Sequence, residues 1–138
     1  MRSLLLIAAF IGLTSSTTEP KIIPWELLAI PYTTTVDGLY EPQFPSYLDK
    51  YKNQEVIIQG YLVPVDVEGN QYALSKTAFA SCFFCGKAEP NTVVELVFAE
   101  KPDSFVTDQF VVVKGMLTFN EDDPYRLFFI LKNVEFYG

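Results

Sequence analysis

The chain has 138 residues, of which 49% are hydrophobic and 15% aromatic. This composition is typical of one folded domain with a packed core and excludes a disordered chain. Acidic residues outnumber basic ones by 17 to 10, and the sequence contains no histidine. Because the basic residues are also scattered singly, the sequence argues against nucleic acid as a partner and against attraction to an anionic membrane surface. A Ser-His-Asp catalytic triad is excluded.

The first sixteen residues have the pattern of a secretory signal peptide. Arg2 supplies a positive charge, residues 4–13 are uncharged and mostly apolar, and small residues follow up to Ser16. Such a run is too short to span a bilayer, which takes about twenty residues. We expect cleavage after Ser16 and a periplasmic or secreted mature protein with no membrane span once the leader is removed.

Residues 17–54 form the next segment, which is rich in proline and aromatic residues. We expect an irregular arm docked on the core by large side chains, namely Trp25, Tyr32, Phe44 and Leu48. A helical turn is expected to begin at Pro24, and a short helix is expected over residues 46–52.

The short helix is predicted from its ends. Ser46 is the expected N-cap and Asn53 suits the C-terminal stop.

From Glu55 onward the hydrophobic pattern changes to an alternation typical of β-strands. The sequence predicts five antiparallel strands, at residues 55–63, 71–74, 92–99, 109–119 and 125–136. Pro64 is expected to end the first strand, and a turn around Gly69 and Asn70 to lead into the second.

Two of these segments repeat one frame. Residues 56–62 and 111–117 each have three apolar residues, a polar residue, a glycine and two apolar residues, with Gly60 and Gly115 in equivalent places. A glycine inside an apolar strand is typical of a bend or bulge, and a small barrel bends its long strands to close. The predicted fold class is therefore all-β, with small helical elements: an OB-type barrel of five strands over residues 55–138, preceded by the arm.

The sequence resembles a family of exported bacterial proteins of uncharacterised function with an OB-like barrel and a cysteine-rich loop. The similarity lies in residues 48–64, in Tyr72-Ala-Leu74, in Ala80-Ser-Cys-Phe-Phe-Cys-Gly86, in Pro90-Asn91 and in the Val93-Val-Glu-Leu strand. The resemblance implies a periplasmic or secreted location and supplies no activity.

The motif with the most chemistry is Cys82-Phe83-Phe84-Cys85-Gly86, which holds both cysteines of the chain. In an oxidising compartment, an even number of cysteines within one loop favours a structural disulfide between Cys82 and Cys85. Such a small ring removes little chain entropy, so it would act by fixing the shape of the loop.

Two alternatives stay open for this pair. The spacing also fits half of a zinc or other thiophilic metal site, with Glu89 and Glu95 as candidates for the missing ligands. A thiol-disulfide redox centre is the third interpretation, although the βαβ context of a thioredoxin fold is absent.

The sequence contains no recognisable enzyme active site. We therefore interpret the chain as an exported binding or accessory module of the bacterial cell envelope, with a protein partner and no cofactor. The alternative is a metal-binding accessory protein that uses Cys82 and Cys85.

Overall fold

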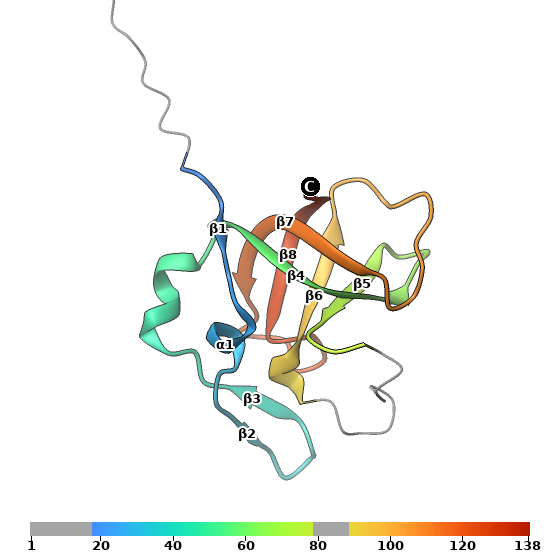
Figure 1. Ribbon diagram of the computed structural model, residues 1–138. Coiled ribbons are helices and arrows are strands. Elements are labelled where there is room, and N and C mark those ends of the chain that lie inside the picture. Colours follow the sequence, from blue (N-terminus) through green and yellow to red (C-terminus); the bar gives the residue numbers. More distant parts are fainter. Residues whose placement is uncertain (1–17, 79–88) are drawn as a thin grey trace, which may run out of the picture.

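The computed structural model describes residues 18–78 and 89–138. Strands β4 to β8 form a barrel, and the elements that precede β4 pack against one side of it (Figure 1). In chain order the elements are β1 (Lys21–Ile22), α1 (Trp25–Leu28), β2 (Tyr32–Thr34), β3 (Tyr40–Pro42), η1 (Ser46–Tyr51), β4 (Glu55–Asp66), β5 (Gln71–Ser75), η4 (Pro90–Thr92), β6 (Val93–Phe98), β7 (Phe110–Phe119) and β8 (Phe129–Phe136). Within the described ranges, no helix has the length and apolar character needed to cross a membrane.

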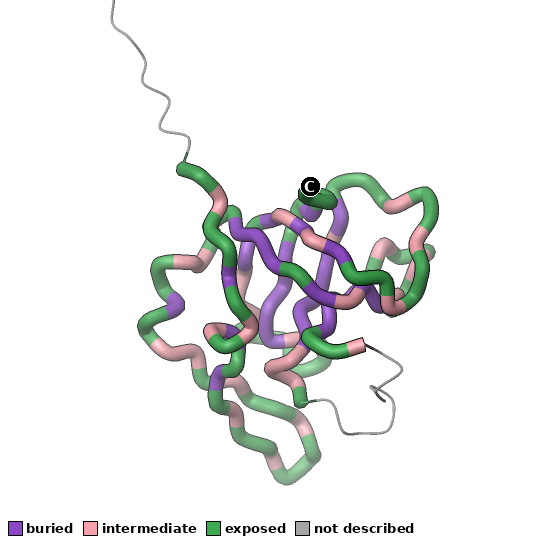
Figure 2. Tube along the Cα trace, viewed as in Figure 1, coloured by how far each residue is buried: buried purple, intermediate pink, exposed green. Residues whose placement is uncertain are grey.

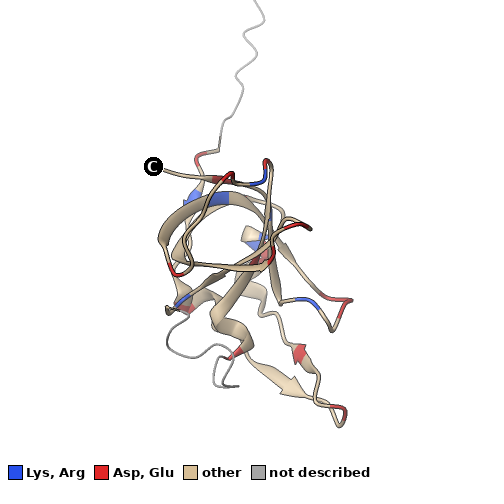
Figure 3. Ribbon diagram, turned by 90° about the vertical axis from the view of Figure 1, so that its right-hand side faces the viewer, with Lys and Arg blue, Asp and Glu red and all other residues tan. Residues whose placement is uncertain are grey.

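The barrel closes because β4 pairs with a strand along each of its edges. Its first half is antiparallel to β7 and its second half is antiparallel to β5. The ring then runs from β5 to β6, β8 and β7 and back to β4, and it is seen as a ring in Figure 3. This is a five-stranded OB-type barrel, and the predicted fold class is confirmed.

The prediction that all five strands are antiparallel is wrong for one pair. β6 and β8 run parallel, with Glu95 opposite Ile130 and Leu96 opposite Leu131. The reason is geometric, because an odd number of strands cannot alternate in direction all the way around a closed ring. One neighbouring pair of a five-stranded ring must be parallel.

The repeated glycine frame forms the seam between β4 and β7. The two copies lie antiparallel, so that Gly60 faces Val111 and Val56 faces Gly115. A Cβ at Gly60 would come within 2.6 Å of the Ser75 carbonyl oxygen, and one at Gly115 would lie 2.8 Å from the Lys132 carbonyl oxygen. Both glycines are therefore needed because backbone approaches backbone there, and Gly115 also lies at a shift in the β7–β8 register.

Two predicted strand ends are wrong. β4 continues through Pro64 to Asp66. Among the described residues, β4 pairs beyond Leu62 with β5 alone, and a strand with one free edge tolerates a residue that lacks an N–H. β8 begins at Phe129 rather than Tyr125. The preceding residues are held in a loop by side-chain hydrogen bonds described below.

The barrel interior is filled by alternate residues of the five strands. Figure 2 shows the buried positions concentrated in the barrel strands. Among the largest fully buried side chains are Tyr72, Leu74, Leu96, Leu117 and Phe129. The Tyr72 ring makes edge contacts with Phe98 and Phe105.

The arm is anchored mainly by aliphatic side chains rather than by the predicted rings. Leu48 is fully buried as expected, but Trp25, Tyr32 and Phe44 are only partly buried against the core. The other fully or almost fully buried arm residues are Ile23, Leu28 and Ile30. These compact aliphatic side chains belong to the buried core cluster, whereas the broad rings pack against that cluster. Trp25 also donates a hydrogen bond to the Gln59 carbonyl (2.8 Å).

The arm has more regular structure than expected. β1 adds parallel to β4, and β2 and β3 form an antiparallel hairpin that projects from the barrel (Figure 1). Its turn contains Asp37 and Gly38, and Gly38 has a φ of +81°, which is the conformation that glycine tolerates best. The Asp-Gly pair between β-prone residues is a hairpin signal that the prediction overlooked.

The predicted short helices are present, with one correction. α1 begins directly after Pro24, and the segment after Pro45 forms the 3₁₀ helix η1. Ser46 is not its N-cap, because Pro45 occupies that position and no side chain caps the helix. Asn53 has a φ of 58°, as suits the residue that stops a helix.

Candidate binding face around loop 120–128

Loop 120–128 joins β7 to β8 at the rim of the barrel, and Asn120 holds it in shape. The Asn120 side-chain amide donates to the carbonyls of Asp123 (2.6 Å) and Arg126 (3.2 Å). Its side-chain oxygen accepts from the Asp123 N–H (3.0 Å), and its backbone N–H donates to the Phe128 carbonyl (2.8 Å). One asparagine thus fixes a loop whose other residues are mostly exposed.

An ion pair ties this loop to the outer face of the barrel. Glu95 is a β6 residue whose side chain points outward yet is buried. The Arg126 guanidinium donates to both oxygens of the Glu95 carboxylate, through Nη2 to Oε1 and through Nε to Oε2 (3.2 Å). This hydrogen bonding is the main cause that raises the pKa of Arg126, and the charges of Glu95 and Asp123 add to it. Because one guanidinium makes both hydrogen bonds, they fix the orientation of the Arg126 side chain across the barrel face.

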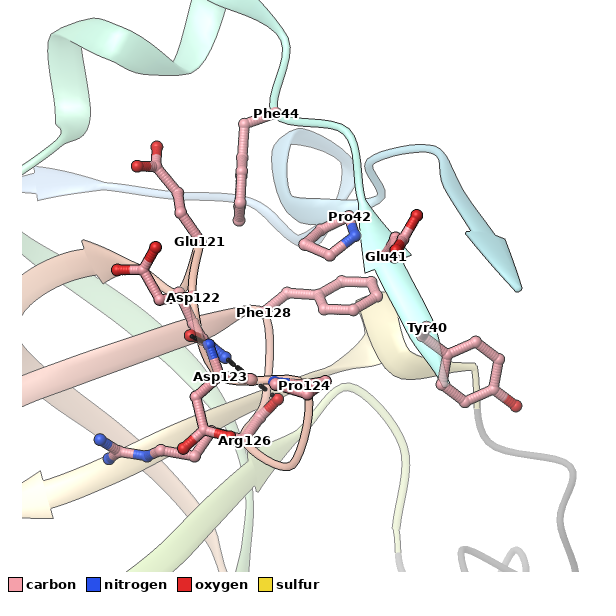
Figure 4. A pocket seen from close by; sticks show the side chains of 11 residues that line it. Tyr40, Glu41, Pro42, Phe44, Glu121, Asp122, Asp123, Pro124, Arg126 and Phe128 are labelled. Atoms are coloured by element: carbon pink, nitrogen blue, oxygen red, sulfur yellow. Dashed lines mark hydrogen bonds between the residues drawn. The ribbon is translucent and has the colours of Figure 1, made fainter. Parts of the chain in front are cut away.

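Three hollows in the described part of the chain share this loop. The β5 hollow, about 440 Å³, lies over Gln71, Ala73 and Glu95 and is walled by Tyr125 and Leu127. The β3 hollow, about 480 Å³, lies between β3 and residues 120–124 (Figure 4). The central hollow, about 240 Å³, lies between these two and is lined by Tyr40, Pro90 and Pro124. Arg126 borders all three.

The β5 hollow lies where OB barrels commonly bind ligands. In that fold the ligand face is formed by the second and third strands and by the loops after the first and fourth strands. Here these parts are β5, β6, the turn after β4 and loop 120–128. Ala73 lies opposite Glu95 in the strand register, so both side chains are on the outer face under the hollow.

Two tyrosines flank the central hollow. Tyr125 is 85% exposed and Tyr40 is 45% exposed, and both border this hollow. Tyr40 makes an edge contact with Tyr32 (ring centroids 5.3 Å apart). Partial burial raises the pKa of Tyr32, and the negative charge of Glu89 adds to the effect. Exposed aromatic rings beside carboxylates suit a ligand that is apolar in part and not anionic.

The predicted site residues are only partly within the described structure. Cys82 and Cys85 lie outside the described residues, so the disulfide, zinc and redox interpretations stay predictions. Glu89 precedes η4 and accepts hydrogen bonds from Thr92 at its backbone carbonyl. Its side chain borders the central hollow.

Glu95 is paired with Arg126, and its role as a metal ligand beside Cys82 and Cys85 stays a prediction, because both cysteines lie outside the described residues. Both of its carboxylate oxygens are engaged by Arg126. Within residues 18–78 and 89–138, no group of three or more cysteine, aspartate or glutamate side chains is arranged to hold a metal ion. The structure therefore presents Glu95 as the anchor of a loop.

The contacts that build this face were not predicted from the sequence. Arg126 and Glu95 are 31 positions apart in sequence, and no local pattern connects them. The acidic residues 121–123 are evident in the sequence, but the shape of the turn that they occupy depends on Asn120. The sequence does indicate a turn here, because an asparagine and a proline flank consecutive acidic residues, a pattern that is typical of a structured turn.

The fold and the rim together define an OB-type barrel with a candidate ligand face around loop 120–128. Its fold is similar to that of a DUF3299 family protein from Pseudomonas aeruginosa PAO1, known from a crystal structure. The two superpose with a TM-score of 0.59 at 15% sequence identity, over 88% of this chain and 98% of the other. At this identity the likeness establishes a shared fold.

The sequence comparisons add no further assignment. No protein-family model matches the chain, and no curated protein matches it.

Proposed function

We propose that this chain is an exported binding module of the bacterial cell envelope, which engages a protein partner through the face around loop 120–128. The observation that carries the proposal is that three adjoining hollows share this one loop. One of them lies over β5 and β6, where OB barrels commonly bind ligands. The likeness to the DUF3299 family protein supports the barrel on which this face is built.

The chemistry of the face favours a protein over a nucleic acid. Its guanidinium, on Arg126, is already paired with Glu95, and carboxylates surround the hollows. A phosphate backbone requires free positive charge. Exposed tyrosines instead match the side chains that are enriched at protein interfaces.

Crosslinking in the living cell tests the proposed face. A photoreactive phenylalanine analogue replaces Tyr125 in the full-length protein, and the matched control carries it at Phe110. Phe110 is also an exposed aromatic residue, 54% exposed, but it lies at the other end of β7. We expect one defined protein adduct from position 125 and none from position 110. Equal labelling at both positions, or none at position 125, would overturn the proposal.

Export has its own test. Protein recovered from fractionated cells should be found outside the cytoplasm, and its N-terminal residue should be Thr17 if cleavage follows Ser16. Recovery of the full-length chain from the cytoplasm would contradict export.

The cysteine pair is proposed as a disulfide in the same compartment. Thiol titration of the purified protein should find no free thiol before reduction and two after it. Free thiols together with stoichiometric zinc would favour the metal-binding alternative. Free thiols without metal would favour the redox interpretation.

A further inference from the structure

The hydrogen-bond pattern of the β2–β3 hairpin shows which backbone groups lie along its outer edge. Hydrogen bonds join Gln43 to Pro31 (2.9 Å) and Thr35 to Leu39 (2.8 Å) at the two ends of its ladder. Because hydrogen-bonded pairs alternate with non-bonded pairs in an antiparallel ladder, the bonded pair between them is Thr33 with Glu41. The backbone groups of the residues on either side of Glu41 therefore point away from β2.

These outward groups are the N–H and C=O of Tyr40 and the C=O of Pro42. In the described part of the chain, β3 pairs with β2 alone. An unpaired strand edge of this kind is a template for another strand. The edge is short, so a ligand would need further contacts beside it.

The β3 hollow supplies those contacts. It adjoins β3 and is bounded on its far side by residues 120–124. Figure 4 shows apolar groups between the two walls, and these include Pro42, Phe44 and Phe128. The Phe44 ring stacks on Phe119 and meets Phe129 edge to face, so the floor of the hollow is fixed by the core.

The charge around the hollow selects its occupant. Glu41 stands on the β3 side, and Asp122 and Asp123 stand on the loop side. The Arg126 guanidinium pairs with Glu95, and its side chain points away from the hollow in Figure 4. Glu121 is paired with Lys52 at 3.0 Å. A hollow with this balance is complementary to a cation on an apolar stem, which describes a lysine or arginine side chain.

We propose that a basic, extended segment of the protein partner adds to the outer edge of β3 as a third strand. The β3 hollow receives one of its lysine or arginine side chains between the aromatic floor and the carboxylates. The backbone bonds provide affinity and the hollow provides selectivity, as in other cases of strand addition. This inference rests on the proposed binding function and names the chemistry of the segment that is bound.

The test uses a ten-residue synthetic peptide of alternating lysine and threonine, with alternating glutamate and threonine as the control. Binding to the ¹⁵N-labelled protein is followed by NMR. We expect the lysine peptide to shift the amide signals of Tyr40 and Glu41 and to slow hydrogen exchange at the Tyr40 amide. Its binding should weaken as the salt concentration rises. The glutamate peptide should not bind. Equal effects of both peptides, or of neither, would overturn the proposal.

Two sets of variants separate strand addition from plain charge attraction. Two lysine peptides are N-methylated at alternate residues, one at the odd positions and one at the even positions. Each keeps its charge but loses the backbone N–H donors along one of its two edges. One frame should bind roughly tenfold more weakly, the loss expected from one or two hydrogen bonds. If neither frame is weakened, strand addition is wrong.

On the protein, Glu41→Gln and Asp122→Asn should each weaken binding about threefold, whereas Glu100→Gln, an exposed acid on another loop, should leave it unchanged. Uniform losses at all three positions would show unspecific attraction and overturn the proposal. If the lysine peptide instead shifts Ala73 and Glu95, the assignment to β3 fails while the proposed binding face stands. Failure of the Tyr125 crosslink is the separate sign that the binding function itself is wrong.

Discussion

Along the seam between β4 and β7, Gly60 and Gly115 leave no space for a Cβ, because the backbones of β5 and β8 approach them closely from the other side. At the rim, loop 120–128 crosses the end of the same barrel and leaves three hollows open beside it. Steric fit determines the seam, whereas a few polar side chains determine the rim. In this small barrel, the residues that determine closure are therefore separate from the residues that shape the hollows at the rim.

The largest effect is expected at the seam. Gly60→Ala should lower the free energy of unfolding by about 3 kcal/mol or more, because the added methyl group meets a backbone carbonyl that cannot move aside. The measurement is denaturant unfolding followed by circular dichroism. Gly38→Ala is the matched control, since a Cβ there meets nothing within 4 Å and only the positive φ is strained. Equal losses for both variants would contradict a steric origin.

The next largest effect is expected in the arm. Two variants there test whether the arm is anchored by burial or by the size of its rings. Leu48→Ala should cost about 2 to 4 kcal/mol, since Leu48 is fully buried. Trp25→Ala should cost about 2 kcal/mol, because its ring is only partly buried and it loses a hydrogen bond to Gln59. A larger loss for Trp25 than for Leu48 would show that the rings carry the arm after all.

A smaller effect is expected when the rim ion pair is broken. Arg126→Ala leaves the buried Glu95 carboxylate without its partner, at a cost of about 1 to 2 kcal/mol at neutral pH after allowance for the exposure of Arg126. The measurement is denaturant unfolding at neutral pH, and an unchanged stability would show that the ion pair does not hold the rim.

A double mutant checks this interpretation of the ion pair. Adding Glu95→Gln to Arg126→Ala removes the unpaired charge, and part of the lost stability should return. A double mutant no more stable than Arg126→Ala would mean that the unpaired charge is not the cause of the loss.

The smallest effect is expected from Asn120→Ala, which removes the side-chain bonds inside loop 120–128. The fold should lose about 1 kcal/mol, because the loop is exposed and water replaces the bonds. Hydrogen exchange should speed up at residues 120–126 and stay unchanged at Val56 and Val113. Faster exchange at the seam as well would show that the two regions are coupled.

Much of the barrel was predictable because its signals are local. Alternating β-prone residues locate the strands, and the repeated glycine frame indicates where two of them bend. The parallel pairing of β6 with β8 was not read from any local pattern, although it follows from counting strands in a closed ring. Pro64 misled the prediction because its effect depends on whether the strand has a partner on both edges.

The face around loop 120–128 was hardly predictable, for a different physical reason. It depends on Glu95 and Arg126, which meet only after the barrel has closed. Their residue types are common on any surface, so the sequence does not distinguish them. The Asp-Gly turn between β2 and β3 is the exception, because its signal was present and local.

The parallel neighbours β6 and β8 have a consequence for how the barrel forms. β8 lies between β6 and β7, so without residues 129–136 both neighbours have an open edge and the ring cannot close. The contact that closes it joins residues 93–98 to residues 129–136, which are far apart in sequence. Closure of the barrel therefore depends on long-range contacts, the kind that slow the folding of β proteins.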